Sequence, residues 1–228
     1  MKNWAFILAL VCYGASVYSQ SDLQNFALEF QSLKAREAKP ELVYESIPGN
    51  PYYSTDFIDS KIYTLQGDTL SIPLRYDLYK DEMEFQKDGK TMWINKKMVQ
   101  RIAYGNNNVI ICPEKDQGAP TYFFVVKEGE YSLLKKQRVN FLPPEELKGF
   151  ADPKPARFEP ASTEYFIRYK NRAPAAIIAK KDLRAIAGND ASAIEFLKKE
   201  KIRRDLEKDL IKYVVFLSTA NIEPGVQE

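Results

Sequence analysis

Acidic residues form the densest group of side chains that could do chemistry. The group comprises Asp77, Asp81, Glu82 and Glu84, with Arg75 and Lys80 beside it. Two carboxylates that face one cleft can act as acid and base on a glycoside, and clustered carboxylate oxygens can bind Ca²⁺. Alternation of polar and apolar residues here places Glu82 and Glu84 on the solvent face of a strand. Asp77 and Asp81 then flank a turn. We therefore predict that all four acids face water, and we rank a glycan hydrolase as the lower alternative.

Histidine is absent from all 228 residues, which removes the commonest general base and metal ligand. Cys112 follows an apolar run and lacks this usual activating base, so we expect a small apolar strand residue rather than a nucleophile. The sequence contains no Gly-rich phosphate loop, no Cys/His metal set and no Gly-x-Ser-x-Gly elbow. We predict a non-enzymatic protein with no catalytic residue, no cofactor and no metal site.

Basic residues gather near the C-terminus. They are Lys198, Lys199, Lys201, Arg203, Arg204, Lys208 and Lys212. Four acids are interspersed with them, several at i, i+4 helical spacing, so we interpret the run as a solvated helix face. Contact with an anionic envelope surface is the alternative. The whole chain has 33 basic and 31 acidic residues, and this near balance argues against nucleic acid as a partner.

The first 19 residues have the three-part layout of a secretory signal peptide. Lys2 precedes a short apolar run over residues 4–13, and small or permitted residues lead to a cleavage site between Ser19 and Gln20. The run is shorter than the roughly 20 apolar residues that a membrane span needs. Lipid attachment at Cys12 is a second possibility, but Val11 is not the small residue that it requires. We expect an exported chain, soluble after cleavage, in the periplasm or outside the cell.

The elements that must position the acids are strands. Leu70, Ile72, Leu74, Tyr76 and Leu78 recur at every second position, which is the period of a strand with one apolar face. A further alternating segment follows, and a turn at residues 88–89 reads Asp-Gly, which is a strong signal for a tight hairpin. Proline at position 73 has no backbone N–H to donate to a neighbouring strand, so we expect this strand to be an edge strand or to be bulged there.

The rest of the mature chain predicts more short strands with helices at both ends. We expect an N-terminal helix over 22–37, and further strands at 57–65, 98–104, 109–112, 122–126, 131–136, 164–169 and 175–178. Five prolines over 142–160 predict an irregular strap, which Phe150 and Phe158 can anchor on the sheet. Three helices should follow: 181–187, ended by Gly188; one capped near residue 190; and one from about residue 205.

These elements define an α+β fold with an antiparallel meander that is strongly curved or closes towards a barrel. The predicted divisions are a signal peptide at 1–19, an N-terminal helix and entry strap at 20–56, a sheet domain at 57–179 and a helical subdomain at 180–228 packed on the sheet. Three functions remain open. The first is binding of a protein partner or an apolar ligand through the sheet, the second is structural docking in an envelope assembly, and the third is carboxylate-based glycan hydrolysis.

Several segments of the chain resemble a group of exported proteins of Bacteroidota-type bacteria. They read Gly-Asn-Pro-Tyr-Tyr at 49–53, Ile-Pro-Leu-Arg-Tyr-Asp-Leu-Tyr-Lys-Asp-Glu-Met-Glu-Phe at 72–85, Lys-Pro-Ala-Arg-Phe-Glu at 154–159, and Lys-Lys-Asp-Leu to Asp-Leu-Ile-Lys over 180–212. The resemblance covers nearly all of the mature chain and implies a Gram-negative envelope or secreted setting. It implies no particular activity, cofactor or catalytic residue.

Overall fold

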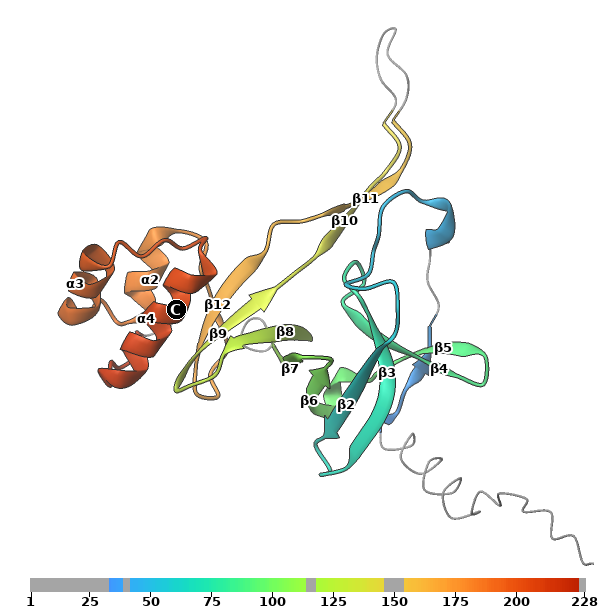
Figure 1. Ribbon diagram of the computed structural model, residues 1–228, viewed down its shortest axis with the longest axis horizontal. Coiled ribbons are helices and arrows are strands. Elements are labelled where there is room, and N and C mark those ends of the chain that lie inside the picture. The colour runs from blue at the N-terminus through green and yellow to red at the C-terminus, as the bar shows by residue number, and fades with distance from the viewer. Residues whose placement is uncertain (1–32, 39–41, 114–117, 146–153, 226–228) are drawn as a thin grey trace, which may run out of the picture.

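A computed structural model describes residues 33–38, 42–113, 118–145 and 154–225. Its main feature is an antiparallel sheet of eleven strands, in the order β1-β5-β4-β3-β2-β6-β7-β8-β9-β12-β13 (Figure 1). The strands are β1 (Arg36–Glu37), β2 (Ile58–Thr64), β3 (Thr69–Asp77), β4 (Glu82–Lys87), β5 (Lys90–Trp93), β6 (Val99–Tyr104), β7 (Asn107–Pro113), β8 (Pro120–Lys127), β9 (Tyr131–Lys136), β12 (Glu164–Tyr169) and β13 (Ala175–Ala176). The chain departs from the meander between β5 and β6, where it crosses to the far side of β2.

Strand β3 confirms the alternation predicted from the sequence. Leu70, Ile72, Leu74 and Tyr76 are buried, while the residues between them are exposed as far as Pro73. Pro73 pairs with Asp59 of β2, whereas the pairing with β4 begins only at Arg75, so β3 is a local edge at the proline. The Asp-Gly turn between β4 and β5 has positive φ at both residues, 51° and 74°, as a tight primed turn requires.

The sheet is strongly curved, and its inner face is filled with side chains. Tyr76 of β3 contacts Tyr122 and Phe124 of β8, with ring centroids 5.4 and 6.0 Å apart, although three strands separate β3 from β8. Buried side chains from β2 to β8, including Ile62, Leu74 and Phe85, form one continuous core. The sheet does not close into a barrel, because β1 and β13 end it as separate edges. Of the two forms expected from the sequence, the barrel is therefore wrong and the open curved sheet is present.

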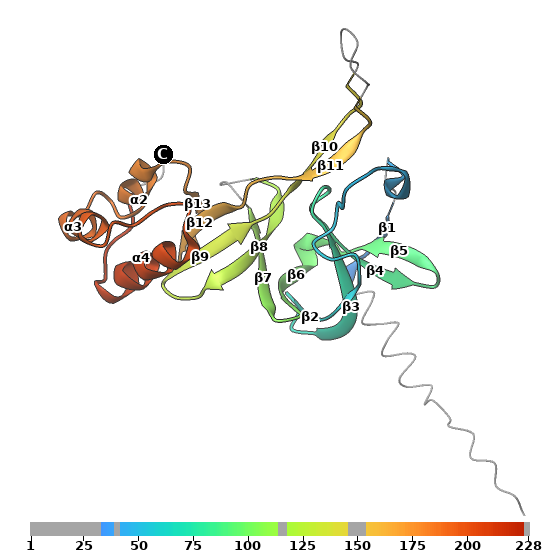
Figure 2. The same cartoon turned by 45° about the horizontal axis from the view of Figure 1, so that its top comes forward.

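Three helices cover the β9–β12 end of the sheet (Figures 1 and 2). They are α2 (Lys180–Ile186), α3 (Ala191–Lys199) and α4 (Glu207–Thr219). Gly188, with φ of 61°, follows α2, and the Asp190 carboxylate caps α3 by accepting from the amides of residues 192 and 193. Leu133 and Ile167 of the sheet pack with apolar residues of all three helices in a second core.

Two expectations for the segments outside the central strands were wrong in part. Most of the helix expected over 22–37 lies outside the described residues, but its predicted end does not form: Lys34 has φ of 43°, and Arg36–Glu37 is strand β1, paired with β5. The expected strap over 142–160 contains regular structure. Val139–Leu142 (β10) and Arg157–Pro160 (β11) pair as a two-stranded ribbon that extends from the sheet (Figure 2).

Phe158 anchors this ribbon, as predicted, although its contacts are not with the sheet's inner face. Its ring packs against Tyr44, Tyr79 and Phe141, with centroids 5.2, 5.4 and 5.7 Å away. Its amide donates to the carbonyl oxygen of Pro48 at 2.8 Å. The ribbon is therefore fixed to the segment that precedes β2, while Phe150 lies outside the described residues.

Candidate functional site

The four acids do not face water as predicted. Asp77 is 1% exposed and Glu84 is 4% exposed, so both carboxylates are buried. Register explains part of this: Arg75 pairs with Glu84 and Asp77 pairs with Glu82, so these four share the sheet face opposite Tyr76. That face was expected to be open, but Tyr44 bonds to Asp77 and Tyr52 lies over Arg75 there, while the Arg36 side chain of the edge strand β1 reaches Glu82.

Glu84 is held by a cation and an indole. Arg75 donates to one carboxylate oxygen through Nε and Nη2, at 3.1 and 2.8 Å, and Trp93 donates Nε1–H to the other at 3.2 Å. The Arg75 guanidinium also lies over the rings of Tyr52 and Phe57, 3.9 and 4.7 Å from their centroids. Both oxygens of Glu84 are thus engaged in contacts that fix β3, β4 and β5 to each other.

Asp77 is held by three hydrogen bonds. One carboxylate oxygen accepts from the backbone amides of Tyr79 and Lys80, and the other from the Tyr44 hydroxyl, all at 2.9 Å. Burial raises the pKa of Asp77 above its usual range, and these donors oppose that change. Asp77 therefore joins the β3–β4 turn to the segment that precedes β2.

Asp81 lies on the inner side of the sheet, apart from Asp77 and Glu84. It has φ of 56° and accepts from the hydroxyls of Tyr76 and Thr121, each at 2.6 Å, and from the Lys96 ammonium at 3.0 Å. Thr121 in turn accepts from Lys136, which is buried. This network connects the β3–β4 turn to β8 and β9 across the curved sheet.

Glu82 is the last of the four acids and pairs with two cations. Arg36 of β1 lies 2.8 Å from its carboxylate and Lys96 lies 3.8 Å away. Burial raises the pKa of Glu82, and the two cations act in the opposite direction. The four acids therefore divide between two faces of the sheet, and each carboxylate is engaged by neighbouring donors or cations rather than turned towards one cleft.

Two other residues that could act as nucleophiles, Cys112 and Tyr52, are not activated. Burial raises the pKa of the Cys112 thiol, which disfavours the thiolate. Burial also raises the pKa of Tyr52 to about 12, so its hydroxyl stays protonated. Within the described residues, no cluster of three or more His, Cys, Asp or Glu side chains could hold a metal ion. In the same part of the chain, no helix is both long and apolar enough to cross a membrane.

The basic run predicted as one helix face is divided. Lys198 and Lys199 end α3, residues 200–206 form a connection, and Lys208 and Lys212 lie on α4. Arg203 pairs with Asp209 at 3.2 Å, and Arg204 is exposed. A continuous basic surface along one helix is therefore not formed.

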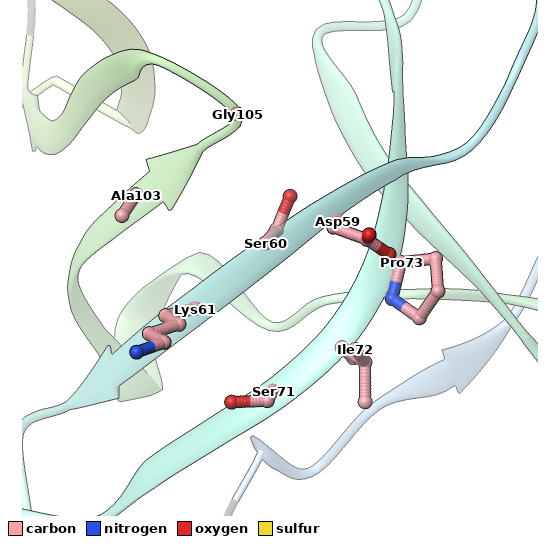
Figure 3. A pocket seen from close by; sticks show the side chains of 8 residues that line it. All are labelled: Asp59, Ser60, Lys61, Ser71, Ile72, Pro73, Ala103 and Gly105. Carbon is pink, nitrogen blue, oxygen red and sulfur yellow. The ribbon is translucent and has the colours of Figure 1, made fainter.

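Three surface cavities lined by described residues are candidate binding sites. The first has a volume of about 360 Å³ and lies over β2, β3 and the end of β6 (Figure 3). Its lining includes Asp59 and Lys61 of β2 and the small or short side chains of Ser71, Pro73 and Ala103, with Gly105 next to them. A second, of about 320 Å³, borders Arg75 and Glu84. The third and largest, of about 730 Å³, lies between β12, the end of β13 and the loop before α4. Sequence reasoning missed all three, since each is lined by segments distant in the chain.

Comparison of the chain with protein-family models, with curated proteins and with solved structures gives no match. The resemblance to exported proteins of Bacteroidota-type bacteria stays a prediction, and so do the signal peptide, with its cleavage between Ser19 and Gln20, and the division into domains. Residues 1–19 lie outside the described part of the chain. Any function must therefore be argued from the sheet, the buried acids and the cavities.

Proposed function

We propose that this is an exported, non-enzymatic protein that docks to a protein partner through the outer surface of its sheet. The observation that carries the proposal is the filled inner face. Tyr76, Tyr104 and Tyr122 are almost fully buried there among aliphatic side chains, so the curved sheet has no hollow among the described residues for an apolar ligand. Of the two binding functions suggested by the sequence, docking fits this arrangement better.

The state of the acids disfavours the third function, glycan hydrolysis. A glycosidase needs two carboxyl groups on either side of the scissile bond, with access for the sugar. Asp77 and Glu84 are buried under their donors, and Asp81 lies on the other side of the sheet. Substitution of Glu82 and Glu84 by glutamine together would test this: any glycan-degrading activity of the purified protein should persist in the variant at a urea concentration where its unfolding curve shows that it is folded.

Chemical crosslinking in the native cells, followed by purification of this chain, tests the docking proposal. We expect a discrete crosslinked species that contains one other protein in constant ratio. A chain that stays monomeric at every crosslinker concentration, while exposed lysines are modified, contradicts it. Lys61 and Lys199 are exposed and on separate surfaces, so their modification provides the internal control.

A further inference from the structure

The outward face of β2 carries a row of side chains that is complementary to its own reverse. Side chains at every second position of a strand share one face, and on this face they are Phe57, directly before β2, and then Asp59, Lys61 and Tyr63. An aromatic ring stands at each end of the row, and the two charges between the rings have opposite signs. Read in the opposite direction, the row has the same order with the signs exchanged.

The surface around the two charges is low. Lys61 pairs with Ser71 of β3 on one side and with Ala103 of β6 on the other. Asp59 pairs with Pro73 of β3, and its carbonyl oxygen accepts from the amide of Gly105 at 3.2 Å. These neighbours have short side chains or none, so the cavity of about 360 Å³ forms over them (Figure 3). A second protein surface can therefore approach the sheet closely here.

The two charged groups are available for a contact, while the rings at the ends of the row are held in place. Asp59 and Lys61 are exposed, and neither forms an ion pair with a residue that the structure describes. The rings carry the guanidinium groups of Arg75 and Arg101, which lie 4.7 and 3.8 Å from the ring centroids. Ordered rings lose little conformational entropy when another surface docks on them.

We propose that a second copy of this chain docks on the face, with its β2 antiparallel to the first β2 across the interface. A twofold axis that lies in the interface and crosses β2 at Ser60 places Asp59 of each copy opposite Lys61 of the other, and Phe57 opposite Tyr63. Sheets pack face to face about 10 Å apart, a distance that aspartate and lysine side chains together bridge.

The second copy is the occupant that the charges favour. A twofold contact pairs both charges of each copy at once, whereas another protein would have to supply the reversed row itself. Three strands about 5 Å apart, with four outward positions about 7 Å apart, give a patch of about 15 by 20 Å. Stable interfaces bury about 800 Å² on each side, so we expect a reversible dimer with a Kd of about 10–100 µM.

Sedimentation velocity of the purified protein over about 5–500 µM tests this interface by charge exchange. We expect the natural chain to pass from monomer to dimer over that range. Asp59→Lys and Lys61→Glu should each weaken dimerisation by about tenfold or more, because like charges then face each other. An equimolar mixture of these two variants should dimerise again, since each supplies the charges that the other lacks. Lys199→Glu, at an exposed position at the end of α3, is the control and should leave the Kd unchanged.

Three results would overturn the inference: a natural chain that stays monomeric up to about 500 µM, a Kd that the two single substitutions change no more than the control does, or a mixture of the two variants that does not dimerise. The urea unfolding curve of each variant checks that it is folded.

The dimer involves a second copy rather than another protein, so the inference goes beyond the proposed docking function and the two can fail separately. If in-cell crosslinking captures another protein while the purified chain stays monomeric, docking stands and the dimer does not form. If the dimer forms and no other protein is captured, the dimer stands and docking fails.

Discussion

Asp77 provides the sharpest test of whether the buried acids are structural. Its three hydrogen bonds join backbone amides of the β3–β4 turn to the Tyr44 hydroxyl. Asp77→Ala removes all three and leaves two amides without their acceptor, so we expect a loss of about 3–5 kcal/mol in the free energy of unfolding. Asp77→Asn keeps an oxygen for the two amides, and its amide group can donate to the Tyr44 oxygen. We expect this variant to lie within about 1 kcal/mol of the natural protein.

The free energy of unfolding should also depend on pH through Asp77, in a direction that the pKa change predicts. Because burial raises the pKa of Asp77, the folded state holds a proton there more tightly than the unfolded state. The contribution of Asp77 to stability is therefore largest below its unfolded pKa and falls as pH rises through its folded pKa. The natural protein should gain stability relative to Asp77→Asn as the pH is lowered from neutral to about 4.

Urea unfolding followed by fluorescence measures both effects. Trp4 belongs to the predicted signal peptide, so in the mature protein Trp93 is the sole tryptophan and reports on the packing around Glu84. Asp56→Asn, at an exposed position, is the control and should show neither effect. Equal, small losses for Asp77→Ala and Asp77→Asn, or a relative loss of stability in the natural protein on acidification, would refute the structural role.

Three further predictions concern stability and use the same assay. Glu84→Ala should cost about 3 kcal/mol or more, because the half-buried guanidinium of Arg75 and the Trp93 indole lose the carboxylate that they bind; a loss below about 1 kcal/mol would contradict these contacts. Gly49→Ala should cost about 2 kcal/mol or more, since φ is 97° and an added Cβ would clash with a β11 carbonyl. Its control, Gly67→Ala, has φ of 94° but open space and should cost only about 1 kcal/mol; equal costs would exclude the clash. Tyr213→Phe should cost about 1 kcal/mol through loss of the hydrogen bond to an α2 carbonyl, and no change would place that hydroxyl in water.

Local sequence patterns correctly predicted those features of the fold that depend only on residues close together in the chain. The alternation in β3 and the Asp-Gly turn depend on neighbouring residues only, and both are present in the structure. The same reasoning predicted that one face of β4, with Glu82 and Glu84, is exposed to solvent. It failed there because Glu84 is covered by residues 44–52 and by Trp93, and no pattern within β4 carries information about such distant segments.

Pairing between strands that are distant in the sequence could not be predicted from local patterns either. Strands β10 and β11 are separated by a proline-containing segment, and each is too short to show a clear period. The candidate site at β12 could not be predicted either, since it depends on where β13 ends and where the chain before α4 lies. Ile178 is the one residue there that the sequence marks, as an apolar residue directly before the helical region. The sequence pattern, however, places Ile178 in a strand and does not indicate that its side chain is exposed.

Native mass spectrometry of the protein purified from its own host tests the central claim most directly. The account predicts a chain that begins at Gln20, alone or with a protein partner, and free of small molecules. A stoichiometric apolar ligand that survives purification and contacts the sheet's inner face would contradict it, because Tyr76, Tyr122 and their neighbours fill that face.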